Sequence, residues 1–270
     1  MNIFRFEFKR NLKSCLIWSA ICSALIILFM SMFPSMKSSG MQDIIFSKID
    51  ALPSGMLEAF NISMINFSNL NDYLGYAIQY IFMAGAVYAA LLGVSSLIKE
   101  ETDGTIEFLY SKPVKRSSIL FSKLLAIALI YCLFVVIVGI FTICISIIVK
   151  PEDISVLNMI MDIKIIFIGM IILGYVFMAI GLLLSVIIKS SKQGTSLSIG
   201  VFFITYFLGI TGKIKEEVKV LKLLSPFDYF LPSKLLKDGL NITYTIVSVI
   251  VIIVLIFLSN FIYKRKDMKI

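Results

Sequence analysis

Six long apolar stretches constrain this chain more than any other feature of its sequence. A helix needs about 20 apolar residues to cross the ~30 Å hydrocarbon core of a bilayer, because each residue advances the helix by about 1.5 Å. Six stretches meet or approach that length: 14–33, 73–98, 119–149, 165–188, 195–212 and 242–263. The fifth is the shortest, and it lies between two glycines. We therefore expect an all-α, polytopic membrane protein with six transmembrane helices in a single domain, residues 1–270.

The scarcity of charge supports this class. Apolar residues make up 59% of the chain and charged residues 16%, whereas a soluble domain carries about 25% charged residues to cover its surface. A large soluble core is excluded on that ground, so the main solvent of this protein is lipid.

Basic residues predict the orientation of the spans. Six crossings place both termini on one side, and most of the 25 Lys and Arg residues lie in the flanks on that side. The positive-inside rule therefore predicts that both termini are cytoplasmic. The segment 213–237 opposes the rule, because it holds six lysines on the other side. If the fifth span did not cross the membrane, the orientation of every later segment would be reversed. A composition rich in Ile, Lys and Asn indicates a bacterial plasma membrane.

Histidine, the usual zinc ligand and general base, is missing. The four cysteines lie inside apolar runs, where a thiol behaves as a small hydrophobe. We therefore expect no catalytic residue, metal site, disulfide or cofactor. No G-x-x-x-x-G-K-[ST] loop is present, because Gly212-Lys213 lacks both the earlier glycine and the following hydroxyl.

The spans themselves hold few polar groups. Lys123 lies near the cytoplasmic end of the third span, where we expect its side chain to extend to the interface. Gln79 is the most polar interior residue of the second span. Ion-coupled carriers usually hold carboxylates inside the membrane, so this pattern disfavours an ion-coupled carrier or channel. Small residues four apart in the second span, such as Gly85, Ala89 and Gly93, predict close helix packing. We favour packing within one subunit over a dimer face.

The first thirteen residues have an amphipathic pattern. Phe4, Phe8 and Leu12 share one helical stripe, and a second stripe beside it holds Arg5, Lys9 and Lys13. This pattern predicts a helix lying on the membrane surface. The alternatives are a basic flank that only orients the first span and a strand in which Phe4, Phe6 and Phe8 alternate.

Two polar connections contain apolar side chains that a solvated loop would not need. In the connection after the second span, Ile106, Leu109 and Tyr110 share one face of a short helix that Pro113 would end, which predicts a docking surface. In the connection after the fifth span, Ile214, Val218 and Leu221 share one stripe. That second stripe predicts an interfacial or re-entrant helix broken near Pro226.

Three short stretches together resemble one family. The first stretch is the basic start of the chain, which ends with Glu7-Phe8-Lys9-Arg10. The second follows the second span and runs from Glu100-Glu101-Thr102-Asp103-Gly104-Thr105-Ile106-Glu107 through Ser111-Lys112-Pro113-Val114-Lys115-Arg116 to Lys123. The third is Leu224-Ser225-Pro226-Phe227 before the last span. This order is similar to the type-2 permease family of ATP-binding-cassette (ABC) transporters, which contains mostly exporters.

The resemblance implies a coupling helix at about 104–110 that inserts into a separate ABC ATPase, with the opening helix bracing it. The residues assigned to this coupling region are Glu100, Glu101, Gly104, Thr105, Ile106, Glu107, Leu109, Tyr110 and Pro113. The acidic residues among them either pair with Lys or Arg of the opening helix, of this connection or of the ATPase, or are solvated. ATP and magnesium would bind to the ATPase, and no nucleic acid is expected as a partner.

The resemblance also implies alternating access between two permease subunits, identical or not, along a pathway between their second and fifth spans. A hydrophobic or amphipathic substrate, such as a peptide, an antibiotic or a lipid, is expected. Two alternatives remain: a non-exporting role in sensing or assembly, and a membrane protease, for which Glu100-Glu101 and Glu216-Glu217 are the candidate motifs. The protease is disfavoured because neither pair has the expected following arginine and the chain has no histidine.

Overall fold

The computed structural model describes residues 3–36, 53–62, 66–102, 114–152, 154–188, 190–214 and 216–266. Within these ranges the chain forms helices and no strand, and six helices are long and apolar enough to cross a membrane. They are α1 (Ile3–Ser31), α5 (Leu70–Thr102), α7 (Arg116–Val149), α8 (Val156–Ile187), α9 (Ser191–Ile214) and α12 (Ile242–Arg265). This confirms the all-α prediction of six spans.

Shorter helices connect the spans. They are α2 (Phe33–Met36), α4 (Ser54–Ala59), the 3₁₀ helix η1 (Glu216–Leu224), α10 (Pro226–Tyr229) and α11 (Pro232–Asp238). The sequence predicted one helix in the fifth connection with a break near Pro226. The structure has a further break at Val218, whose backbone is not helical (φ −114°, ψ 24°).

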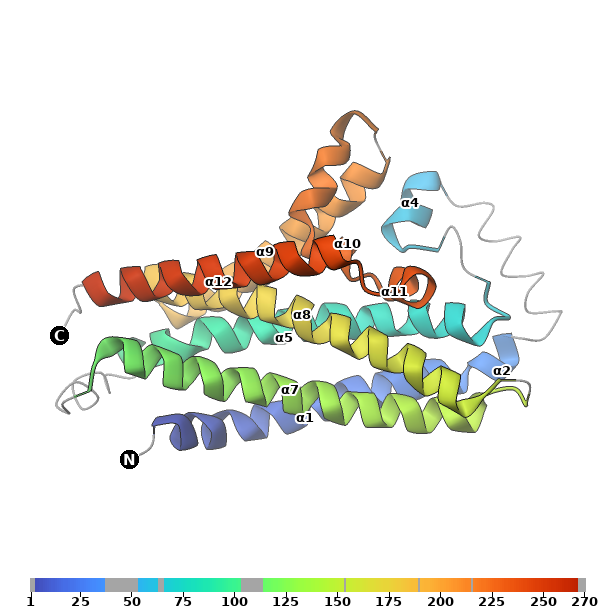
Figure 1. The fold of residues 1–270 in the computed structure, drawn as a ribbon, viewed down its shortest axis with the longest axis horizontal. Helices are drawn as coiled ribbons and strands as arrows, with labels where there is room; N and C mark the ends of the chain where they lie inside the picture. The colour runs from blue at the N-terminus through green and yellow to red at the C-terminus, as the bar shows by residue number, and fades with distance from the viewer. Residues whose placement is uncertain are drawn as a thin grey trace.

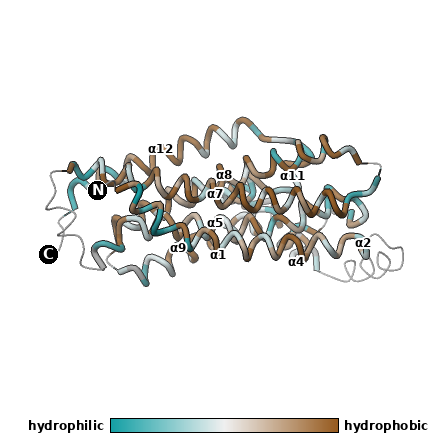
Figure 2. Tube along the Cα trace, turned by 90° about the horizontal axis from the view of Figure 1, so that it is seen from below, coloured by the Kyte–Doolittle hydropathy of each residue, from teal (hydrophilic) through white to brown (hydrophobic). Residues whose placement is uncertain are grey.

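The two termini lie at the same end of an elongated bundle (Figure 1). We call this the basal end; it also carries the C-terminal end of α5 and the N-terminal end of α7, and the opposite end is the distal end. Helices α1, α5, α7, α8 and α12 follow the long axis. Hydrophobic residues cover the middle of these helices and hydrophilic residues gather toward the ends (Figure 2), which is the distribution that a bilayer requires.

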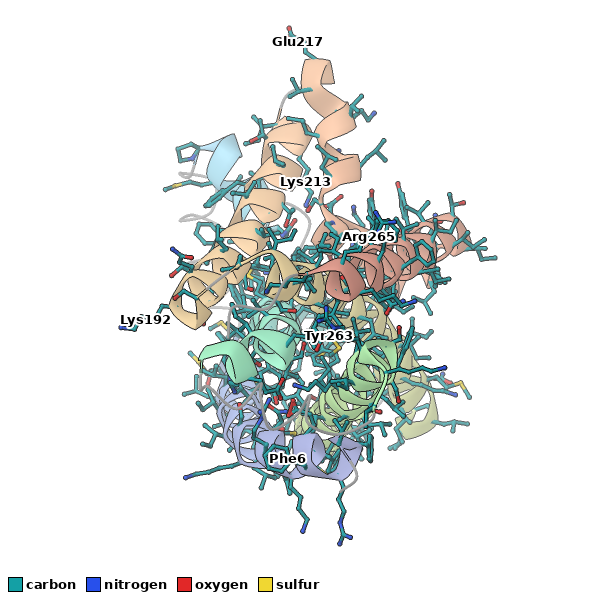
Figure 3. All side chains as sticks on the ribbon, turned by 90° about the vertical axis from the view of Figure 1, so that its left-hand side faces the viewer. Phe6, Lys192, Lys213, Glu217, Tyr263 and Arg265 are labelled. Carbon is teal, nitrogen blue, oxygen red and sulfur yellow. The ribbon has the colours of Figure 1, made fainter. Side chains whose placement is uncertain are left out.

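Helix α9 takes a different path. It runs obliquely from Lys192 past Lys213 and, with η1, forms a hairpin that stands away from the other helices, with Glu217 near its tip (Figures 1 and 3). Ile214 at the end of α9 lies against α4, since a methyl group added at Gly55 would lie 3.6 Å from Ile214 Cδ1. The fifth span is therefore a long helix, but much of it lies beside the main bundle.

Helices α5 and α8 form the centre of the bundle. In their most apolar windows 72% and 67% of residues are buried, against 11% in α12. The exposed side chains of α12 are large and apolar; they include Ile246, Ile250, Ile253 and Phe257. Since such a face is unstable in water, we infer that α12 meets lipid.

The central pair is held by contact between backbones. A methyl group added at Gly93 of α5 would lie 2.2 Å from the carbonyl oxygen of Met178, and one added at Gly181 of α8 would lie 2.2 Å from the carbonyl oxygen of Ala90. Glycine is thus the residue that allows this crossing. The small residues Gly85 and Gly93 of the second span pack against other helices of the same subunit, as the sequence analysis favoured.

Helix α1 is continuous from Ile3 to Ser31. Its buried residues keep helical spacing throughout, from Glu7 and Asn11 to Ile26 and Met30. The predicted interfacial segment 1–13 is therefore not a separate helix, because its buried face continues without a break into the face that packs on α7. A location of this segment at the membrane surface stays a prediction.

Candidate functional site at the basal end

Four charged side chains from three helices meet at the basal end. Glu7 and Arg10 come from α1, Glu100 from the last turns of α5, and Lys123 from about two turns inside α7. We call this set the basal charge cluster. The two carboxylates and the two cations give it no net charge.

Lys123 lies at the centre of the cluster, and its side chain is 1% exposed. Its Nζ donates a hydrogen bond to the carbonyl oxygen of Ser96 at 2.7 Å, lies 3.6 Å from Glu7 Oε1, and forms an ion pair with Glu100. The prediction that Lys123 extends to the interface was therefore wrong. The reason is that α1 and α5 bring carboxylates to its ammonium group, and this neighbourhood does not follow from the sequence of the third span.

Glu7 is the other deeply buried member, at 1% exposure. Its Oε1 lies 2.5 Å from Arg10 Nη2, one helical turn away, and Arg10 Nη1 lies 3.7 Å from Glu100 Oε1. Each carboxylate thus faces both cations. A buried charge is tolerated when it is paired in this way, whereas removal of one partner leaves the others uncompensated.

The cluster lies where the predicted coupling segment leaves the bundle. Glu100 is two residues before the end of α5, and the chain is next described at Val114. Outside the described residues lie Gly104, Thr105, Ile106, Glu107, Leu109, Tyr110 and Pro113, as does the side chain of Glu101. The coupling helix stays a prediction, but the helix that leads into it is anchored to α1 and α7 through Glu100.

The opening turns of α1 have three faces. The exposed face holds Arg5, Lys9 and Lys13, and a half-buried face holds Phe4, Phe8 and Leu12. The buried face holds Glu7 and Asn11 and contributes Glu7 to the basal charge cluster, and the sequence analysis did not identify it. Its signal was a polar stripe at four-residue spacing, Glu7-Asn11-Cys15-Ser19, which continues into the first span.

A second contact at the basal end joins α7 to α12. Arg116 Nη1 donates to the carbonyl oxygens of Tyr263, Lys264 and Lys266, the last at 2.8 Å. Since the last carbonyls of a helix have no partner within the helix, Arg116 caps α12. One turn deeper, Ser117 Oγ donates to Asn260 Oδ1 at 2.9 Å.

Toward the distal side, a second polar network surrounds Asp228 of α10. Lys213 Nζ and Lys234 Nζ lie 2.6 and 2.9 Å from its carboxylate oxygens. Lys213 also donates to Asn61 Oδ1 at 2.7 Å, and Asn61 Nδ2 donates to Gln79 Oε1 at 3.2 Å. Burial on its own would raise the pKa of Asp228, but the two ammonium groups outweigh it and hold the pKa below its ordinary value of 3.8.

This network neutralises part of the lysine-rich segment 213–237, although the positive-inside rule counts lysines rather than net charge. Lys213 and Lys234 of the lysine-rich segment share the charge of Asp228, and Lys237 Nζ lies 3.9 Å from Asp72 Oδ1. The excess of positive charge on the distal side is therefore smaller than the number of lysines suggests.

Six membrane-length helices, with charged side chains clustered near the helix ends and in the connections, define a polytopic helical membrane protein. The family model described as ABC-2 family transporter protein matches residues 1–268. The chain belongs to the ABC-2 family and is the membrane permease component of an ABC transporter, a class that works with an ABC ATPase. A comparison with curated proteins finds no match.

Proposed function

We propose that this permease exports a hydrophobic or amphipathic substrate by alternating access, driven by a separate ATPase that docks on the segment 104–110 at the basal end. ATP and magnesium are bound by that ATPase. Two permease subunits enclose the pathway, and both termini face the cytoplasm of a bacterial cell.

The basal charge cluster is the observation that carries this proposal. Force applied to the segment after Thr102 reaches α5 first, and Glu100 connects α5 to α1 through Arg10 and to α7 through Lys123. Helix α5 in turn contacts the backbone of α8 at Gly93. Because packed backbones move together rather than deform, a displacement at the basal end would move the central pair of helices.

Aromatic side chains between α5 and α9 support an amphipathic substrate. Tyr80 Oη donates to Tyr76 Oη at 3.1 Å on α5. On α9, the ring of Tyr206 lies 5.3 Å from that of Phe227 and 6.1 Å from that of Phe202. Such rings offer both apolar area and hydroxyl groups. Tyr76, Tyr80 and Tyr206 are half-buried on the second and fifth spans, whereas Phe202 and Phe227 are buried.

The docking assignment is tested by co-purification of this chain with its partner ABC ATPase. An aspartate at Ile106 places a charge on the apolar face of the predicted coupling helix, so Ile106→Asp should lower recovery of the ATPase at least ~10-fold. Val220→Asp is the matched control, because Val220 is 72% exposed on η1, away from the basal end, and it should leave recovery unchanged. Equal recovery with Ile106→Asp would reject docking at 104–110.

The remaining alternatives make different predictions. An ion-coupled carrier would transport in vesicles without any ATPase, whereas the proposed exporter would not. A sensing or assembly role would retain the ATPase complex but show no ATP-dependent movement of substrate.

A further inference from the structure

A groove on the outer surface of the bundle has no role in the proposed transport cycle. Its volume is about 450 Å³, and it is lined by Phe121, Leu124, Leu125, Ala128, Tyr175, Met178, Ala179, Ile252 and Ile256. Helix α8 forms its floor, and α7 and α12 form its walls. Helices α7 and α12 meet at the basal end, where Ser117 donates a hydrogen bond to Asn260. This bond lies one helical turn closer to the basal end than Phe121 and Ile256.

The groove suits an apolar chain. Tyr175 supplies the only hydroxyl among these lining residues, and that hydroxyl already lies 2.8 Å from Cys132 Sγ. No lining residue offers an unpartnered polar group to a ligand. Phe121 and Leu125 are half exposed, so they offer apolar surface. The volume lies within the ~300–1,000 Å³ typical of ligand pockets.

Its depth matches one leaflet. From Arg116 at the start of α7 to Ala128 the helix rises about 18 Å at ~1.5 Å per residue, and one leaflet contributes about 15 Å to the hydrocarbon core. A chain entering at the basal end would therefore reach about the middle of the bilayer.

Basic residues surround the basal end of the groove. Lys115 and Lys264 are exposed, and Arg116 holds its positive charge against the end of α12. Lys264 continues the stripe of Ile252, Ile256 and Asn260 on α12. The guanidinium carbon of Arg265 lies 4.1 Å from the centre of the Phe261 ring, and Figure 3 shows Arg265 on the outer part of this helix. Basic groups at the membrane surface attract anionic headgroups.

We propose that this groove binds one acyl chain of an anionic phospholipid of the basal leaflet, with the headgroup phosphate held by Lys264, Arg265 and Lys115. The lipid adds to the contact between α7 and α12 over α8. This assignment does not depend on the direction of transport or on the substrate.

The test uses the full-length chain, purified in detergent and stripped of lipid, with dioleoyl phosphatidylglycerol or dioleoyl phosphatidylcholine added. Native mass spectrometry measures the bound lipid. The wild-type protein should bind one phosphatidylglycerol at least about fivefold more tightly than phosphatidylcholine. Equal affinity for the two lipids would overturn the headgroup assignment.

Two variants separate the chain from the headgroup. Ala128→Trp fills the groove and should abolish binding of both lipids, whereas Leu129→Trp, which places the same bulk at a neighbouring exposed position, should not. The double change Lys264→Gln with Arg265→Gln should remove the preference for phosphatidylglycerol and leave binding of phosphatidylcholine unchanged.

The charge control removes two exposed basic residues from α1 instead. Arg5→Gln with Lys13→Gln should keep the lipid preference, and an equal loss in this variant would show non-specific attraction and refute the site. Undiminished binding in Ala128→Trp would refute the groove. If Ala128→Trp fails to fold, the two charge variants decide the proposal.

Discussion

The four side chains of the basal charge cluster depend on one another for their charges. Lys123 and Glu7 are each 1% exposed, so neither ion is stabilised by bulk water. Glu7 is instead stabilised by Arg10 and Lys123, and Lys123 by Glu7, Glu100 and the carbonyl oxygen of Ser96. An arrangement of this kind is costly to break at any one member.

Replacement of Lys123 by methionine tests that dependence. Lys123→Met keeps the length of the side chain but leaves Glu7 and Glu100 with Arg10 as their one cation in the cluster, so it should lower the free energy of unfolding by about 3–5 kcal/mol. Denaturant titration in detergent measures the change. Lys9→Met, at an exposed position of α1, should change stability by less than about 0.5 kcal/mol, and equal small effects for both variants would show that the cluster is not a stabilising unit.

Asp228 makes stability depend on pH. Its pKa is lower in the folded protein than the ordinary 3.8, so its ion pairs stabilise the fold above pH ~4 and this contribution is lost as the pH falls through the folded pKa. The stability difference between wild type and Asp228→Asn should be constant above pH 5 and shrink below pH 4. Asp238→Asn, at an exposed position of α11, is the control; a difference that does not vary with pH for Asp228→Asn would contradict the ion-pair account.

At the scale of elements, the crossing of α5 and α8 organises the bundle. The two glycines at this crossing let carbonyl groups of one helix approach the backbone of the other. The remaining spans pack around this pair and expose apolar surface, most of all α12. The central pair is therefore the element through which motion from the basal end would reach the pathway.

Gly93→Ala tests the crossing. The added methyl group would lie 2.2 Å from the carbonyl oxygen of Met178, so the helices must separate, at a cost of about 1–3 kcal/mol. Gly200→Ala is the matched control, because no atom lies within 4 Å of a methyl group there, and it should be neutral or slightly stabilising since alanine favours helix. Melting curves of both variants in detergent measure this, and equal melting temperatures would mean that the crossing is not close-packed.

Across the whole molecule, hydrophobic length predicted the six long helices, because the bilayer requires helices of a fixed minimum length. Spacing of small residues in the second span also predicted close helix packing there, although it did not identify the fourth span as the partner. Two features of the structure could not be predicted from the sequence. The neighbours of Lys123 come from α1 and α5, and the oblique path of α9 depends on contacts with η1 and α4, so both follow from tertiary packing rather than from any one segment.

The candidate site was predicted in part. Glu100 was assigned to the coupling region, and pairing with the opening helix was among the alternatives left open; the structure shows that pairing with Arg10. The contact between Glu7 and Lys123 was missed because residues so far apart in the sequence give no local signal of contact. The number of lysines after the fifth span did not reveal that Lys213 and Lys234 share the carboxylate of Asp228.

The central claim is that motion of a separate ATPase enters this permease at the basal end through Glu100. It is tested most directly by ATP turnover of the complex in lipid vesicles with Glu100→Gln, a change that keeps the shape of the side chain and removes its charge. We predict that the ATPase still co-purifies but that its stimulation by the permease falls at least ~5-fold, the range expected when a coupling free energy is lost. Full stimulation in a complex that contains Glu100→Gln would contradict the account.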